Sequence, residues 1–176
     1  AGRNAIRIGS VPTPTVGYSV KLLNAAGGIA VTASHNPEQW NALKLFDGNG
    51  LFISPEFWNK LESNEFNEQV WVAHDKIGLY EKNDDSCSSH ISKILSLPYI
   101  NQSAIASRRF RIAYDGVGGV GPAILIPLFR EFSADVIPIG HLMDGNFIHE
   151  PEPIPKNLKM LSDLVLKHGV DIGIAT

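Results

Sequence analysis

Short apolar runs alternate with stretches of helical periodicity in the first half of the chain. Isolated apolar runs bounded by Gly, Pro or Asn predict strands, and apolar positions at i, i+3 and i+4 predict helices. The strands expected here span residues 5–9, 29–32, 42–46 and 51–53, the last pair joined by a turn at 47–50. One helix is expected after Thr13, with Pro14 at its first position, and another after Ser54 and Pro55.

The second half repeats a simpler order of elements. Residues 110–114, 134–139 and 171–175 predict strands, and residues 121–132 and 158–167 predict the helices between them. Strand, helix, strand, helix, strand is typical of parallel pairing with helical crossovers. Between the halves, residues 62–89 are polar. Residues 83–89 predict a solvated loop, and a helix is expected over 90–100.

This order of elements predicts the α/β class, as two consecutive three-layer α/β/α units with mixed, largely parallel sheets. The first unit is expected over residues 1–103 and the second over 104–176. Almost no sequence precedes the first strand, and the chain stops at the end of the last one. Both units are therefore expected to be truncated, as in a fragment of a larger protein.

Composition narrows the class of protein. With 176 residues, 44% hydrophobic and 19% charged, the chain has the balance of a folded soluble domain rather than a disordered tail. A net charge of −3 argues against nucleic-acid binding. The sequence contains neither a membrane-length apolar run nor a signal peptide, so we expect no membrane association and a cytoplasmic location. Its single cysteine excludes an internal disulfide.

The chemistry concentrates around Ser34. This serine follows an apolar strand and precedes His35, a group that exchanges protons near neutral pH. Asn36 and Pro37 favour the start of a short helix, whose free N–H groups stabilise an anion such as a phosphate on the serine. Lys44, on the next strand, is expected to bring a positive charge. The set predicts phosphoryl transfer. A capped loop, in which Ser and Asn only satisfy backbone groups, is the structural alternative.

Residues 28–44 carry the most specific motif, with the sequence GIAVTASHNPEQWNALK. This stretch closely resembles the α-D-phosphohexomutase superfamily, which includes phosphoglucomutase/phosphomannomutase and phosphoglucosamine mutase. Three further segments look similar, namely 11–15 (VPTPT), 115–119 (DGVGG) and 140–158 with its PEP triplet. The resemblance is weakest over 62–89. It implies that the first unit is the C-terminal part of the family's domain 1 and the second is most of its domain 2.

The resemblance implies roles for individual residues. Ser34 would be the phosphoserine that donates its phosphoryl group to a hexose monophosphate, through a hexose 1,6-bisphosphate intermediate. His35 and Lys44 would assist proton transfer or neutralise charge. An oxygen of the Ser34 phosphate would ligate Mg²⁺, but the family's other metal ligands belong to an Asp-x-Asp-x-Asp-Arg loop that this sequence lacks. Within the motif, Trp40 and Ala42 depart mildly from the common tyrosine and glycine.

The expected function is therefore that of a phosphohexomutase of the phosphoglucomutase/phosphomannomutase type, interconverting hexose 1-phosphate and 6-phosphate. Its partners would be a phosphorylated hexose and the missing C-terminal domains, without which this fragment is expected to be inactive. Phosphoglucosamine mutase is the alternative within the family. A non-catalytic phosphosugar-binding remnant or a dinucleotide-binding domain is the alternative from another class.

Two other patterns compete with this interpretation. Residues 116–121 (GVGGVG) match a dinucleotide fingerprint, but the acid at the expected spacing, Asp135, opens the following strand instead of ending it. We favour a glycine turn that packs a helix on a strand. A second cluster contains residue types that bind metals, but their spacing is not that of a metal-binding motif. We favour a solvated connection there. Its members are His141, Asp144, His149, Glu150 and Glu152.

Overall fold

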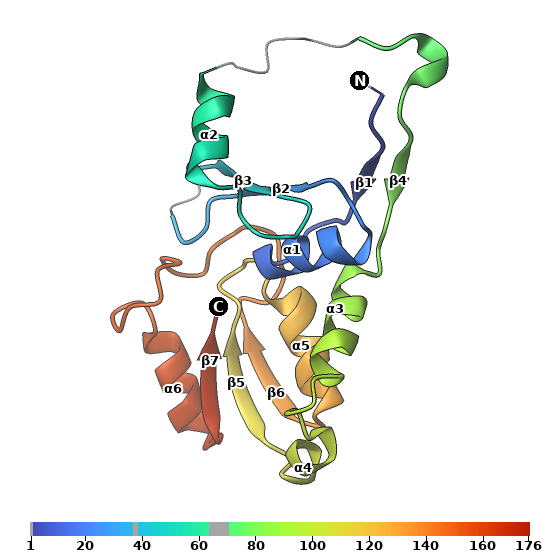
Figure 1. Ribbon diagram of the computed structural model, residues 1–176. Coiled ribbons are helices and arrows are strands. Elements are labelled where there is room, and N and C mark those ends of the chain that lie inside the picture. Colours follow the sequence, from blue (N-terminus) through green and yellow to red (C-terminus); the bar gives the residue numbers. More distant parts are fainter. Residues whose placement is uncertain (1, 37–38, 64–70) are drawn as a thin grey trace. The chain divides into compact units, whose positions relative to one another are not determined.

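The computed structural model describes residues 2–36, 39–63 and 71–176 (Figure 1). The chain forms two compact units. Unit 1 comprises Ala1–Gly9, Thr13–Ala30 and Leu43–Ser86, and unit 2 comprises Ser10–Pro12, Val31–Ala42 and Cys87–Thr176. Within the described ranges, every helix is too short or too polar to cross a bilayer.

Unit 1 is built on two small sheets. A parallel pair joins its first and last strands, and a second pair joins the two strands in between. In chain order the elements are β1 (Ala5–Arg7), α1 (Thr13–Leu22), β2 (Gly28–Thr32), β3 (Ala42–Phe46), α2 (Pro55–Glu62), the 3-10 turn His74–Lys76 and β4 (Tyr80–Lys82). β1 pairs with β4, and β2 with β3.

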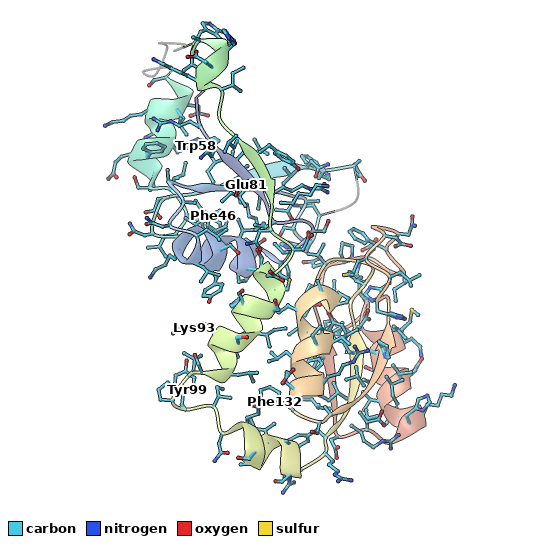
Figure 2. All side chains as sticks on the ribbon, turned by 90° about the vertical axis from the view of Figure 1, so that its right-hand side faces the viewer. Phe46, Trp58, Glu81, Lys93, Tyr99 and Phe132 are labelled. Carbon is cyan, nitrogen blue, oxygen red and sulfur yellow. The ribbon has the colours of Figure 1, made fainter. Side chains whose placement is uncertain are left out.

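Helix α1 supplies the apolar core of unit 1. Val16 and Val20 on this helix are buried, as is Phe46 at the end of β3, whose side chain Figure 2 shows beside α1. Gly17 lets the chain approach closely, since a Cβ there would lie 2.5 Å from the Gly50 carbonyl oxygen and 3.2 Å from the Phe46 ring. Close packing of a helix on a short sheet thus needs glycine at this position.

Helix α2 begins as the sequence predicts but packs less than its pattern suggests. The Ser54 hydroxyl accepts a hydrogen bond from the Phe57 N–H at 3.2 Å, which caps the helix, and Pro55 occupies the first turn. No residue of α2 is buried, and Trp58 is 46% exposed (Figure 2). The cap determines where the helix starts, whereas burial of its side chains contributes little to its stability.

Unit 2 contains a three-stranded parallel sheet in the order β6-β5-β7 (Figure 1). The chain steps from β5 to β6 on one side and then back past β5 to β7, so right-handed crossovers place the two connecting helices on opposite faces. The elements are α3 (Ser86–Leu95), α4 (Gln102–Ser107), β5 (Arg111–Asp115), α5 (Pro122–Glu131), β6 (Asp135–Ile139), α6 (Lys159–His168) and β7 (Ile172–Ala175).

The core of unit 2 lies on the central strand. Ile112 and Tyr114 of β5 pack with Phe129 of α5, and the Tyr114 and Phe129 rings meet edge to face with centroids 5.9 Å apart. The Tyr114 hydroxyl lies 2.7 Å from the Thr176 Oγ1, and burial is the main reason that its pKa is raised. β5 is buried because a strand pairs with it on each side and the connecting helices cover the two faces of the sheet.

The predicted α/β class with small, largely parallel sheets is confirmed. The three strands of the second half and the helices between them lie within two residues of the expected bounds. The return strand expected at 51–53 is reduced to one antiparallel bridge between Phe46 and Phe52. The domain boundary after residue 103 stays a prediction.

The solvated loop predicted at 83–89 is wrong. Helix α3 begins at Ser86, whose side chain is only 2% exposed, and Asn83 stabilises that start by accepting from the Asp85 N–H at 3.0 Å and the Ser86 hydroxyl at 3.2 Å. Short polar residues are common both in loops and at helix starts, where their side chains bond free backbone and hydroxyl groups. The polar run therefore did not reveal the start of the helix. Strand β4 was not expected either, since all three of its residues are exposed and backbone pairing alone defines it.

Candidate functional site

Ser34 lies in the loop that follows β2, two residues beyond the last strand residue, Thr32. The Ser34 N–H donates to the Thr32 Oγ1 at 3.0 Å. The Asn36 backbone N–H and its side-chain Nδ2 both donate to the Ala33 carbonyl oxygen, at 3.1 and 2.9 Å. These bonds close a tight turn over residues 33–36 and present the serine at its tip.

The backbone of Ser34 is strained. Its φ is +57°, in the left-handed region that a non-glycine residue seldom occupies. The side chain is exposed, so burial does not force this conformation. Strain of this kind, at a cost of about 1 kcal/mol, concentrates at sites where a side chain must be held in one direction. Asn24, Arg109 and Ser133 have a similar φ in other connections, so this conformation alone does not mark a reactive residue.

His35 supplies the nearest proton-exchanging group. Its Nδ1 lies 3.4 Å from the Ser34 Oγ, a long hydrogen-bond distance between two exposed side chains. Ser34 and His35 are therefore brought together as the sequence predicts. Lys44 lies on β3 in unit 1, where it lines an open groove of about 400 Å³ with Leu43 and Trp58 among others. Its approach to Ser34 stays a prediction.

The start of the short helix predicted after Asn36 falls outside the described residues. Pro37 and Glu38 lie outside them, whereas Gln39 is in a turn and Trp40 has no regular structure. The Asn36 Nδ2 donates to the Ala33 carbonyl oxygen, as part of the tight turn. The anion site at a helix N-terminus therefore stays a prediction.

The resemblance also implies magnesium, which the donor set here does not fit. Mg²⁺ prefers several oxygen ligands in octahedral geometry. In the described part of the chain, no three side chains among His, Cys, Asp and Glu are grouped so as to hold a metal ion. Ser34 offers a single oxygen. The described residues therefore form no magnesium site by themselves.

The glycine-rich turn after β5 is occupied by the chain's own backbone. A Cβ on Gly118 would lie 2.5 Å from the Asn146 carbonyl oxygen, and one on Gly140 would lie 2.7 Å from the Val117 nitrogen. The Gly118 N–H itself donates to the Gly140 carbonyl at 2.7 Å. The close approach that these glycines permit is to protein rather than to a pyrophosphate, which favours the predicted structural turn over a dinucleotide site.

The solvated connection predicted for residues 141–152 is wrong at one position. The His149 ring is 15% exposed and its Nε2 lies 2.8 Å from the Oδ2 of Asp115, a fully buried carboxylate at the end of β5. Sequence reasoning missed this pair because 34 residues separate its members. The usable signal was an Asp at the carboxyl end of a buried strand, since a buried carboxylate requires a donor.

Comparison with family models assigns both halves of the chain. Residues 1–70 match "Phosphoglucomutase/phosphomannomutase, alpha/beta/alpha domain I", and residues 88–176 match "Phosphoglucomutase/phosphomannomutase, alpha/beta/alpha domain II". Residues 71–87 lie between the two matches, within the polar stretch where the motif resemblance is weakest.

Individual relatives agree with these models. A probable phosphoglucosamine mutase of Methanobrevibacter smithii is 33% identical over 99% of this chain, and a phosphoglucomutase/phosphomannomutase of Thermococcus kodakarensis is 32% identical over 99%. A crystal structure from Thermus thermophilus, provisionally named a phosphomannomutase, superposes on 98% of the chain with a TM-score of 0.81 and 28% identity. The chain spans 38% of the length of each of these two relatives and 39% of that structure. It belongs to the phosphoglucomutase/phosphomannomutase family of phosphohexomutases.

Proposed function

We propose that Ser34 is the phosphoryl carrier of a phosphohexomutase that interconverts hexose 1-phosphate and hexose 6-phosphate. The observation that carries this proposal is the display of the Ser34 hydroxyl, exposed at the tip of a hydrogen-bonded turn with φ +57° and an imidazole nitrogen 3.4 Å away. Asn24, Arg109 and Ser133 also have a positive φ, so the exposed hydroxyl and the nearby imidazole, rather than the φ value alone, support the role. Family membership supplies the reaction class.

The chemical step exchanges one P–O bond for another. A sugar hydroxyl oxygen attacks the phosphorus of phospho-Ser34, the bond from phosphorus to Oγ breaks, and the sugar becomes bisphosphorylated. The sugar hydroxyl loses its proton as the new bond forms, and a proton returns to the serine oxygen. His35 is the described group within reach of that oxygen, so it handles this proton. Reorientation of the sugar and the reverse transfer regenerate phospho-Ser34.

Lys44 is proposed to neutralise charge on the phosphoryl group. A lysine ammonium is a compact positive charge with three donors, suited to phosphate oxygens. Its place on β3, the strand that follows the serine loop, supports this role. Magnesium is proposed to complete this neutralisation in the whole protein, by polarising the phosphoryl oxygens. Its carboxylate ligands are not provided by the described residues, so we assign no step to it here.

The identity of the hexose is a separate proposal. We infer a phosphoglucomutase/phosphomannomutase type, in line with the name of the Thermococcus relative. The Methanobrevibacter relative is named for phosphoglucosamine, and that observation favours glucosamine phosphate as the second candidate.

The test is a mutase assay on the product of the complete reading frame that contains this chain. Glucose 1-phosphate, mannose 1-phosphate and glucosamine 1-phosphate are supplied in parallel, with Mg²⁺ and a catalytic amount of the corresponding bisphosphate. We expect Ser34→Ala to lower turnover by at least about a thousandfold, the scale of losing a covalent carrier. Ser107→Ala, an exposed serine of α4, is the matched control and should leave turnover unchanged.

Two results would contradict the proposal. Substantial turnover by Ser34→Ala would remove the carrier role. Absence of turnover with all three sugars, in a folded protein that still binds phosphosugar, would favour the non-catalytic alternative.

A further inference from the structure

Asp115 is a carboxylate without access to water. It ends β5, the central strand of the unit 2 sheet, and its exposure is 0%. Its Oδ1 accepts from the Val117 N–H at 2.9 Å, and its Oδ2 lies 2.8 Å from the Nε2 of His149. Burying a charge is costly unless donors surround it. His149 is therefore the side chain on which this buried carboxylate depends.

Both ring nitrogens of His149 face acceptors. Nε2 faces the Asp115 carboxylate, and Nδ1 lies 2.8 Å from the Glu150 carbonyl oxygen. A carbonyl accepts only, so Nδ1 must carry a proton. A second proton must lie between Nε2 and Oδ2 for that contact to be a hydrogen bond, and it resides on the imidazole, which is the more basic of the two groups. The geometry thus requires an imidazolium.

The environment of the ring agrees with this charge. Burial alone lowers the pKa of His149, but the hydrogen bonds that the ring donates to Asp115 and to the Glu150 carbonyl, with the Asp115 charge, outweigh burial and leave the pKa raised above its ordinary 6.5. Among the described residues, Asp115 of β5 is the charged side chain that contacts the His149 ring. The neighbouring Glu150 carboxylate lies instead 3.5 Å from the Lys156 Nζ.

The segment that carries His149 has no helix or strand. Backbone bonds join this segment, residues 140–150, to the turn after β5: Ile148 N–H to the Val117 carbonyl at 3.1 Å, and Gly145 N–H to the Gly118 carbonyl at 3.1 Å. Val117 has a φ of +55°, a strained value for a β-branched residue. This turn is stable only while its surroundings hold it, and the ion pair is the buried part of that support.

We propose that His149 forms a proton-dependent contact. As an imidazolium it holds segment 140–150 and the strained Val117 turn against the end of β5. Loss of one proton leaves one ring nitrogen as a lone pair that faces an acceptor, either the Asp115 carboxylate or the Glu150 carbonyl oxygen, and the segment is then released. Asp115 also accepts from the Thr176 N–H through its carbonyl at 3.0 Å, so the same residue joins the carboxyl ends of β5 and β7. Release therefore loosens the sheet edge where α/β proteins place their ligands.

The sign of the pH effect follows from the raised pKa. A group whose pKa is higher in the folded than in the unfolded protein contributes stability that is fully present below the unfolded pKa, ordinarily 6.5. That stability is lost as pH rises through the folded pKa. The contact therefore weakens as pH rises above 6.5 and through the raised pKa of His149.

The test combines NMR with urea unfolding on the 176-residue chain. Proton and carbon shifts of the His149 ring are followed from acid to alkaline pH, together with the amide shifts of Val117 and Ile148. We expect His149 to titrate above 6.5, the two amides to move with the same midpoint, and the urea midpoint to fall through that window. His149→Gln should remove the fall, and His141→Gln, at an exposed histidine of the same segment, should keep it.

A His149 that titrates at or below 6.5 would overturn the proposal. So would amide shifts of Val117 and Ile148 that ignore its titration, or parallel urea profiles for the wild type and His149→Gln. If His149→Gln does not fold, the ring and amide titrations of the wild type decide the question alone.

Discussion

Ser34 combines two features that are visible at different levels. The sequence motif predicts that it is a reactive serine, and the structure adds that its backbone has a φ of +57° within a turn. No pattern of residue types predicts a positive φ at this position, because serine seldom adopts one. The neighbours of this residue in the sequence allowed a prediction of its chemistry, but not of its backbone conformation.

The strain at Ser34 gives a stability prediction. Glycine tolerates a positive φ without steric cost, whereas alanine does not. Ser34→Gly should therefore be more stable than Ser34→Ala by about 1 kcal/mol, measured by urea unfolding of the 176-residue chain. Equal stability of the two variants, or a less stable glycine variant, would show that the backbone of Ser34 is relaxed.

Two buried serines should respond oppositely to truncation. The Ser19 hydroxyl on α1 is buried and finds no hydrogen-bond partner among the described residues, whereas Ser86 donates to the Asn83 Oδ1 at 3.2 Å. Ser19→Ala should stabilise the chain by about 1 kcal/mol, since it removes a desolvated polar group within a helix. Ser86→Ala should destabilise it by about 1 kcal/mol. Urea midpoints that shift in the same direction would contradict this assignment of partners.

At the scale of elements, the second half of the chain was predictable because each strand is a largely apolar run and each crossover helix is periodic. β5, α5 and β6 illustrate this, with apolar runs bounded by glycine, proline or charge. β4 and the start of α3 were not, because exposed strands and polar helix starts carry no hydrophobic pattern. The contact between Asp115 and His149 is a third kind of miss, as it depends on tertiary placement alone.

The glycine turn after β5 gives the element-scale prediction. Gly118 has φ +103° and faces the Asn146 carbonyl, whereas Gly169 at the end of α6 has φ +55° and open space beside it. Gly118→Ala adds a backbone clash to the strain and should cost about 3 kcal/mol. Gly169→Ala adds strain alone and should cost about 1 kcal/mol. Similar urea midpoints for the two variants would mean that the turn and segment 140–150 are not packed together.

For the whole molecule, the family is established and the activity is proposed. The chain spans 38% of the length of the two named relatives. Because phosphoryl transfer depends on positioning and charge neutralisation, we expect the 176 residues alone to show no mutase turnover, even with Mg²⁺ and bisphosphate. The comparison is with the complete reading frame in the same assay. If the 176-residue chain shows turnover and Ser34→Ala abolishes it, the chain needs no further domain for activity, which would contradict this expectation.

The central claim is that Ser34 carries the phosphoryl group, and phosphopeptide mapping tests it most directly. The product of the complete reading frame is incubated with hexose 1,6-bisphosphate and Mg²⁺, digested, and analysed by fragmentation mass spectrometry. We predict one phosphoryl group on Ser34, lost again when excess hexose monophosphate is added, and no phosphorylated peptide from Ser34→Ala. A transferable phosphoryl group on any other residue, with Ser34 unmodified, would contradict the account.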